Sequence, residues 1–225
     1  MSSNIGNIGF YLIHGLDKRR KRFMEVQLRH NNIHVPESNW ITHPNFDDNL
    51  PLGICANNEL TKGQVAITYK HYIALKEVVR SGFDCAVIME DNIEFLSNAA
   101  SRIQIYLNQL PDEWDCLFDS DFNFWRYAEG PTNREQFIYK KSTKKTDQCG
   151  GGTKGVHFYM VSKKGASLLV DNFLPFTDAP DNYLNKLLLK FDMNVYWADP
   201  PNVHKITRGS SWLPKGLIQQ SVMYS

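Results

Sequence analysis

Two carboxylates and an amide follow the most apolar run of the sequence, because Glu90, Asp91 and Asn92 come directly after the segment 85–89. Side-chain oxygens of these types suit hard divalent cations such as Mg²⁺ and Mn²⁺. A metal held there would bridge to a diphosphate and neutralise negative charge as that group departs. The alternative is that these acids only end a strand and face water.

A second acidic pair, Asp119 and Asp121, follows the apolar run 114–118. We rank it below Glu90 and Asp91 as a metal site. It is alternatively a turn with solvated acids, or a sugar contact made together with Trp125. A sugar contact is reasonable because aromatic faces pack on the apolar C–H surfaces of sugars and carboxylates accept hydrogen bonds from hydroxyl groups.

The elements that would position these side chains alternate along the chain. Apolar runs predict strands at 9–13, 85–89, 114–118, 156–161 and 194–198. N-cap and first-turn signals predict helices that begin after Asp17, Thr61, Ser97 and Ser162 and at Pro180. We expect Phe23 and Val26 to face the core from the first helix. In the second helix, the pattern of apolar residues predicts the core-facing set Val65, Tyr69, Tyr72 and Ile73.

This alternation predicts an α/β fold: one domain over 1–225, with a mainly parallel or mixed central sheet and helices on both faces. Ligands of such folds lie beyond the carboxyl ends of the strands, where residues 90–92 are expected. The segment 119–155 is predicted to be a long, partly mobile loop, and 1–7 and 213–225 are predicted to be irregular. His71 lies within the second helix and is interpreted as a packing residue, with support of the site as the alternative.

The composition argues against several partners. The net charge of +1 supplies no overall field for binding nucleic acid. No apolar stretch approaches the roughly 20 residues that span a bilayer, and the start lacks the features of a signal peptide. We therefore expect a cytoplasmic protein, bacterial or virus-encoded. The four cysteines form no C-x-x-C pair and are expected to be reduced.

Four segments, taken in order, resemble one known family. They are LDKRR at 16–20, GQVA at 63–66 leading to His71, VIMEDN at 87–92, and GVHFYMVSKKGA at 155–166. Together they resemble the glycosyltransferases of family 25, which include bacterial lipooligosaccharide galactosyltransferases and procollagen-type enzymes. The resemblance runs from about Phe10 to Ser211.

The resemblance implies a GT-A type, Rossmann-like domain that uses a nucleotide-diphosphate sugar, first of all UDP-galactose or UDP-glucose, together with Mn²⁺ or Mg²⁺. The hexose would pass to a hydroxyl group of a glycan or another acceptor. Donor contacts are then expected from Arg19, Glu90, Asp91, Asn92 and Asp121. The metal ligands are expected to be Asp91, Asn92 and the late histidine His204.

Inverting transfer needs a carboxylate that accepts the proton of the acceptor hydroxyl group. Asp181 is the first choice, because DNYL at 181–184 resembles the family's Asp-x-(Tyr/Phe)-Leu pattern, and Asp178 is the second. The alternative for Asp181 is an ordinary acid in the first turn of a helix, where the helix dipole favours it.

Three features depart from the family pattern. The opening segment lacks the Pro that often follows the Arg pair and is shorter. Asn92 stands in place of a third acid and contributes no charge to a metal site, and Lys70 precedes His71 in place of Ser. The alternative function is therefore a catalytically weak or inactive protein of the same fold that binds a sugar nucleotide or a glycan.

Overall fold

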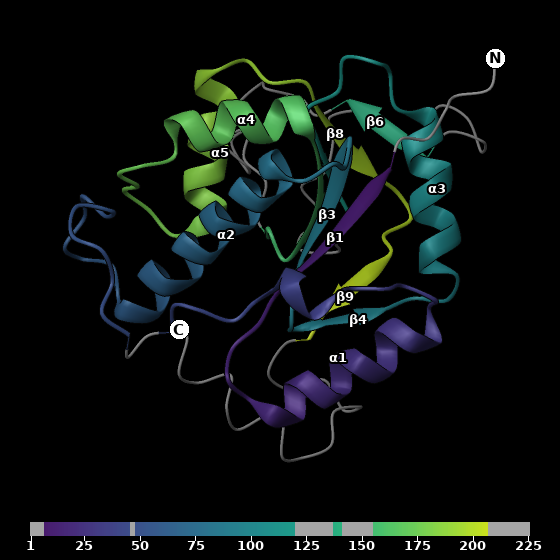
Figure 1. Ribbon diagram of the computed structural model, residues 1–225. Coiled ribbons are helices and arrows are strands. Elements are labelled where there is room, and N and C mark those ends of the chain that lie inside the picture. The colour runs from purple at the N-terminus through teal and green to yellow at the C-terminus, as the bar shows by residue number, and fades with distance from the viewer. Residues whose placement is uncertain (1–6, 46–47, 120–136, 141–154, 207–225) are drawn as a thin grey trace.

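The structure is a computed structural model, and it describes residues 7–45, 48–119, 137–140 and 155–206. Its centre is a seven-stranded sheet with the order β2-β1-β3-β7-β5-β8-β6 (Figure 1). The strands of this sheet are β1 (Ile8–Ile13), β2 (Trp40–Ile41), β3 (Cys85–Glu90), β5 (Cys116–Phe118), β6 (Ile138–Lys140), β7 (Phe158–Ser162) and β8 (Val195–Ala198). A second, two-stranded sheet pairs β4 (Ile93–Phe95) with β9 (Val203–Lys205).

The sheet is mixed, as predicted. β1 is parallel to β2 and β3, and β5 is parallel to β8. β7 runs antiparallel to both of its neighbours, β3 and β5, and β6 runs antiparallel to β8. It follows that β1, β2, β3, β5 and β8 all end at one edge of the sheet, which we call the carboxyl edge.

Helices cover both faces of the sheet, which confirms the predicted α/β class. They are α1 (Lys18–His30), α2 (Lys62–Arg80), α3 (Ala99–Gln109), α4 (Lys163–Asn172) and α5 (Pro180–Lys190). Figure 1 shows α2, α4 and α5 on one face and α1 and α3 on the other. No helix among the described residues is long and apolar enough to cross a membrane.

Strand β3 explains why the sequence has a continuous apolar run. Ala86 and Ile88 belong to the core beneath α2, α4 and α5, whereas Val87 and Met89 belong to the core beneath α1 and α3. All four side chains are fully buried. A strand covered on both faces needs apolar residues at every position instead of at alternate positions.

Most of the predicted helix starts are confirmed. The Asp17 side chain accepts hydrogen bonds from the N–H groups of Arg19 and Arg20, and both halves of the Thr61 capping box are present. Ser162 caps α4 by accepting from the N–H of Gly165 at 3.0 Å, and Pro180 begins α5. The predicted cap Ser97 is wrong, because the N-cap of α3 is Asn98, in the left-handed conformation and without a side-chain cap bond.

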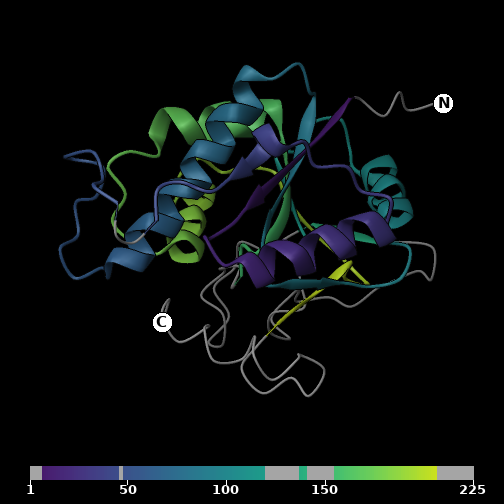
Figure 2. The same ribbon diagram turned by 60° about the horizontal axis from the view of Figure 1, so that its bottom comes forward.

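The predicted inward faces of the first two helices are confirmed in part: Phe23 packs against the core beneath α1 and α3, but Val26 does not. Val26 is 57% exposed, and α1 instead buries Met24 and Leu28. The reason lies in Gln27, whose side chain donates to the carbonyl of Ile93 and accepts from the N–H of Phe95. These bonds fix α1 along β4 (Figure 2). In α2 the predicted residues Val65, Tyr69, Tyr72 and Ile73 do pack against the core, but they are only partly buried. The buried residues of this helix include Lys70 and His71.

The region 119–155, predicted as a loop, contains strand β6, so that prediction is wrong for its described part. The sequence patterns also missed β2, β4 and β9. Each of these strands has two or three residues, too few for an alternating pattern to be recognised.

Candidate functional site

The order in which the chain adds strands to the sheet reverses at β1, which lies between β2 and β3. The chain leaves β1 through α1 and reaches β2 on one side, then crosses through α2 on the opposite face and reaches β3 on the other side. In open α/β sheets this arrangement leaves a crevice beyond the strand ends where ligands bind. His14, Gly15, Glu90 and Asp91 follow or end these two strands, and the N–H of Asp91 donates to the carbonyl of Ile13 at 3.1 Å.

Asp91 is enclosed by donors from the β1–α1 segment. Its Oδ2 lies 2.7 Å from His14 Nδ1 and accepts from the Gly15 N–H at 3.1 Å, and its Oδ1 accepts from Arg20 Nη1 at 3.0 Å. Burial alone would raise the pKa of Asp91, but the His14 hydrogen bond and the Arg20 charge outweigh it and lower the pKa. Asp91 is therefore a buried, ionised carboxylate.

Lys70 adds a second side-chain cation behind the same segment. It is 4% exposed, and its Nζ donates to the carbonyl of His14 at 2.7 Å and to Asn45 Oδ1 at 3.2 Å. Burial lowers the pKa of Lys70 to about 8, against the opposing charges of Asp91 and Asp48. At neutral pH the ammonium form still predominates.

Glu90 has a different set of partners. Its Oε1 lies 3.3 Å from His71 Nε2, and its Oε2 accepts from Asn92 Nδ2 at 3.1 Å. Burial would raise the pKa of Glu90, but the hydrogen bond and charge of His71 and the charges of His157 and Lys205 together lower it to about 2. His71 is fully buried and contacts Tyr159 and Glu90, which confirms it as a packing residue; its support of a donor site stays a prediction.

The rival acidic pair is only partly described. Asp119 is fully buried at the carboxyl end of β5, and its Oδ1 accepts from the N–H of Asn202 at 2.6 Å. Its Oδ2 accepts from the side-chain amide of Asn202. Asp119 thus binds a neighbouring loop and is not a solvated turn residue. Asp121 and Trp125 lie outside the described residues.

The two candidate bases differ in their environment. Asp178 Oδ2 lies 2.5 Å from Lys186 Nζ and accepts from the Thr177 hydroxyl group at 2.5 Å. Burial opposes these contacts, but they outweigh it and lower the pKa of Asp178. Asp181 lies in the first turn of α5. Strand β7 is antiparallel to β3 and therefore ends at the edge opposite Glu90 and Asp91. Helix α4 leads the chain back to the carboxyl edge, where α5 begins. Asp181 therefore lies at the same edge of the sheet as Glu90 and Asp91.

The predicted metal ligands are not gathered into one group. No three His, Cys, Asp or Glu side chains of the described residues are placed to hold a metal ion. His204 lies on β9 opposite Glu94 of β4, and both oxygens of Asp91 accept hydrogen bonds from protein donors. Asn92 Oδ1 is buried without a partner, but its amide nitrogen is committed to Glu90. The arrangement of these residues does not fit a Mn²⁺ or Mg²⁺ site. Binding of a metal ion by this protein stays a prediction.

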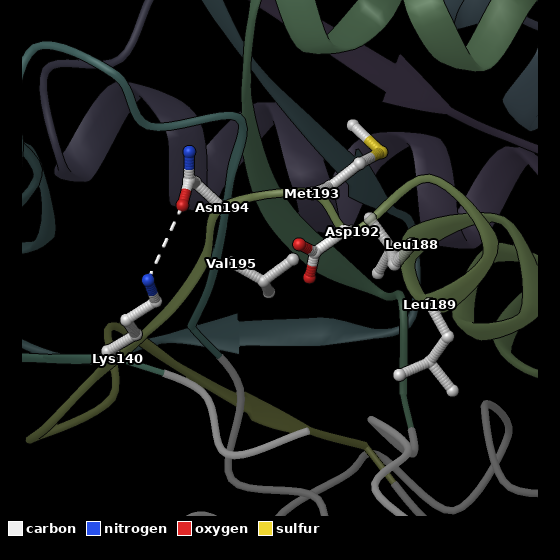
Figure 3. Close-up of a pocket in the computed structure, with 7 residues that line it drawn as sticks. All are labelled: Lys140, Leu188, Leu189, Asp192, Met193, Asn194 and Val195. Carbon is white, nitrogen blue, oxygen red and sulfur yellow. Dashed lines mark hydrogen bonds between the residues drawn. The ribbon is translucent and has the colours of Figure 1, made fainter.

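A pocket of about 170 Å³ lies elsewhere, between the end of α5 and strands β6 and β8 (Figure 3). Lys140, Asp192 and Asn194 supply its polar lining, with Lys140 Nζ 3.5 Å from Asn194 Oδ1. It adjoins the start of β8, at the edge opposite Glu90 and Asp91. None of the predicted site residues lines it.

Sequence reasoning missed His14 and the role of Lys70. Arg19 was the expected arginine, but the structure brings Arg20 to Asp91, and the donor role of Arg19 stays a prediction. The available signal was position: His14 directly follows β1, just as Asp91 follows the neighbouring strand β3. A lone histidine and a helical lysine carry no motif that would have singled them out.

Comparison with known proteins supports the fold and goes no further. No protein-family model matches the chain, and no curated protein matches it. Among solved structures, a crystal structure of A197 from STIV matches with a TM-score of 0.51 and 10% sequence identity, covering 88% of this chain and 83% of that chain. At this identity the likeness shows the fold alone, and the resemblance to family 25 stays a prediction.

Proposed function

We propose that this protein is a glycosyltransferase that moves a hexose from UDP-galactose or UDP-glucose to a hydroxyl group of a glycan or another acceptor. The proposal joins the family resemblance of the four sequence segments to the chemistry of the carboxyl edge. The α/β fold, whose strand order reverses between β1 and β3, is compatible with such an enzyme.

One observation carries the proposal: Arg20 and His14 hold the carboxylate of Asp91, and Lys70 donates to the carbonyl of His14 behind it. The cations Arg20 and Lys70 are opposed there by Asp91 and Asp48, and the guanidinium of Arg20 keeps N–H donors beyond its contact with Asp91. A nucleotide diphosphate is an anion that such a site attracts, and the crevice position is where α/β folds bind nucleotides. Glu90 beside it offers a carboxylate for the hydroxyl groups of the donor.

In this proposal Asp181 is the general base and Asp178 is not. A base must take up a proton, and Asp178 is already engaged by Lys186 and Thr177. Asp181 stands at the same edge of the sheet as the proposed donor site. The acceptor hydroxyl group would give its proton to Asp181 while the bond between the sugar and UDP breaks on the opposite side of the sugar.

The test is donor turnover by the purified chain. Incubation with UDP-galactose and UDP-glucose, each with Mn²⁺ or with a chelator, should release free UDP slowly in the absence of an acceptor. The variant Glu90→Gln with Asp91→Asn should abolish this release while circular dichroism shows a folded protein. Glu37→Gln is the control, because the Glu37 side chain is 93% exposed. Undiminished release by the double variant rejects the proposed site.

A second candidate is a sugar-nucleotide or glycan binding protein of the same fold. The contacts of the two acids favour this candidate, because Arg20 and His14 hold Asp91. His71 and Asn92 hold Glu90 in the same way. Calorimetry separates the two candidates. Saturable binding of UDP-hexose without UDP release, across donors and candidate acceptors, identifies the binding protein.

A further inference from the structure

We propose that the guanidinium group of Arg20 supplies the positive charge that the predicted metal ion would supply, so that the site binds a nucleotide diphosphate without a divalent cation. This inference rests on the proposed function and concerns the same crevice. It starts from the finding that the side chains present do not fit a metal centre.

The first argument is that Asp91 is not available as a ligand. Oδ2 is already occupied by His14 and the Gly15 N–H, and a cation bound to Oδ1 would lie against the guanidinium of Arg20, whose like charge opposes it. The Arg20 side chain is only 17% exposed and that of Asp91 only 9%. Separating such a pair leaves a largely buried charge without its partner, which is strongly unfavourable.

The second argument is that the neighbouring residues cannot replace Asp91. Asn92 is neutral and gives its amide nitrogen to Glu90, and Glu90 is held by His71. His204 lies on β9 across from Glu94 and joins no metal-binding group of the described residues. A divalent cation needs anionic oxygens that converge on one point, and this arrangement supplies none that is free.

The third argument is that the site retains donors for an anion. Arg20 uses only Nη1 on Asp91 through the described contacts, and a guanidinium has five N–H donors in a planar fork that matches a phosphate. Asn45 is 6% exposed, and its Nδ2 has no partner although its Oδ1 holds Lys70. A buried amide donor without an acceptor, next to a buried ammonium, is what a bound anion would satisfy.

The experiment measures the affinity of the intact chain for UDP by calorimetry, with a chelator and then with saturating Mn²⁺. We expect the two affinities to agree within about twofold. Arg20→Gln should weaken binding by at least about tenfold in the chelator, because a charge-assisted hydrogen bond is lost. Arg29→Gln, an exposed arginine of the same helix, should bind as the wild type does.

Two results overturn the inference. In the first, Mn²⁺ raises the UDP affinity about tenfold or more, which means that a metal takes the place assigned to Arg20. In the second, Arg20→Gln binds UDP as Arg29→Gln does, or Arg19→Gln loses binding in its stead. Circular dichroism of each variant excludes unfolding as the cause, and Arg20→Lys, which keeps the charge, should recover part of the affinity.

Failure of this inference is distinguishable from failure of the proposed function. If UDP binds with Mn²⁺ alone, the function stands and the inference falls. If the chain binds inorganic pyrophosphate in the chelator through Arg20 but turns over no UDP-hexose, the inference stands and the enzymatic function falls. If neither UDP nor pyrophosphate binds under either condition, both are rejected.

Discussion

His71 and Glu90 meet in the interior, with His71 Nε2 at 3.3 Å from Glu90 Oε1. The other ring nitrogen of His71, Nδ1, lies 3.2 Å from the hydroxyl group of Tyr159, and the two rings stack at 5.8 Å. The ring of His71, which belongs to α2, is thus held in place by Tyr159 of β7 as well as by Glu90. This contact holds Glu90 ionised at the end of β3.

The depressed pKa of Glu90 predicts acid sensitivity. The pKa falls from 4.5 to about 2 in the folded protein, mainly through His71 against the opposing effect of burial. The corresponding stability is fully present above pH 4.5 and is lost as the pH falls towards 2. The effect is roughly 3 kcal/mol at most. Urea titrations at several pH values in this range give the free energy of unfolding as a function of pH. Its slope against pH should be smaller for Glu90→Gln than for the wild type.

Glu37→Gln serves as the control for that slope, because its carboxylate is almost fully exposed. It should leave the pH dependence as in the wild type. Identical slopes for wild type and Glu90→Gln would show that the Glu90 pKa is not lowered in the folded protein.

His157 predicts a second effect in a higher pH window. Burial lowers its pKa from 6.5 to about 4, so between these values the unfolded chain binds a proton that the folded protein does not. Stability should therefore fall as the pH drops from 6.5 to 4, again by roughly 3 kcal/mol. His157→Gln should flatten this part of the profile. His34→Gln is the control, because His34 is exposed, and a profile unchanged by His157→Gln contradicts the prediction.

The elements were predictable where a local signal specifies them. The Thr61 capping box, the Ser162 cap and Pro180 each act on the first turn that follows, so the sequence alone locates α2, α4 and α5. The continuous apolar run of β3 likewise indicated a strand buried on both faces.

The candidate site was predictable only in part. Residues 90–92 were located at the carboxyl edge because they follow a recognisable strand. The partners of Asp91 were not, because His14 and Arg20 are 77 and 71 residues away in the sequence and meet it only when β1 pairs with β3. The arginine that meets Asp91 depends on the direction in which α1 leaves its N-cap, which a sequence of consecutive basic residues does not fix.

Gly165 gives a prediction about packing. It belongs to the Gly-Ala pair of the segment 155–166, and a Cβ added there would lie 2.6 Å from the backbone oxygen of Asp115. Backbone atoms cannot move aside as a flexible side chain can, so Gly165→Ala should destabilise the protein by about 1–3 kcal/mol. Gly82→Ala is the matched control, because a Cβ at Gly82 meets nothing within 4 Å. Urea midpoints should separate the two variants, and equal midpoints would contradict the close packing of α4 on β5.

The two candidate bases give the last prediction, which rests on the proposed function. Asp178 is held by Lys186 and Thr177, with a lowered pKa, and an acid in such contacts is a poor proton acceptor. Asp181→Asn should therefore lower kcat by about 100-fold or more, the size expected for loss of a general base, with little change in KM. Asp178→Asn should instead leave kcat within about threefold and cost at most about 1 kcal/mol of stability, because the Lys186 side chain of the ion pair is 60% exposed.

Asp171→Asn, at an exposed position of α4, controls for loss of an acid on this face. The decisive result is the comparison of the two kcat values: a large loss in Asp178→Asn with full activity in Asp181→Asn would exchange their roles and would mean that the ion pair with Lys186 opens during turnover.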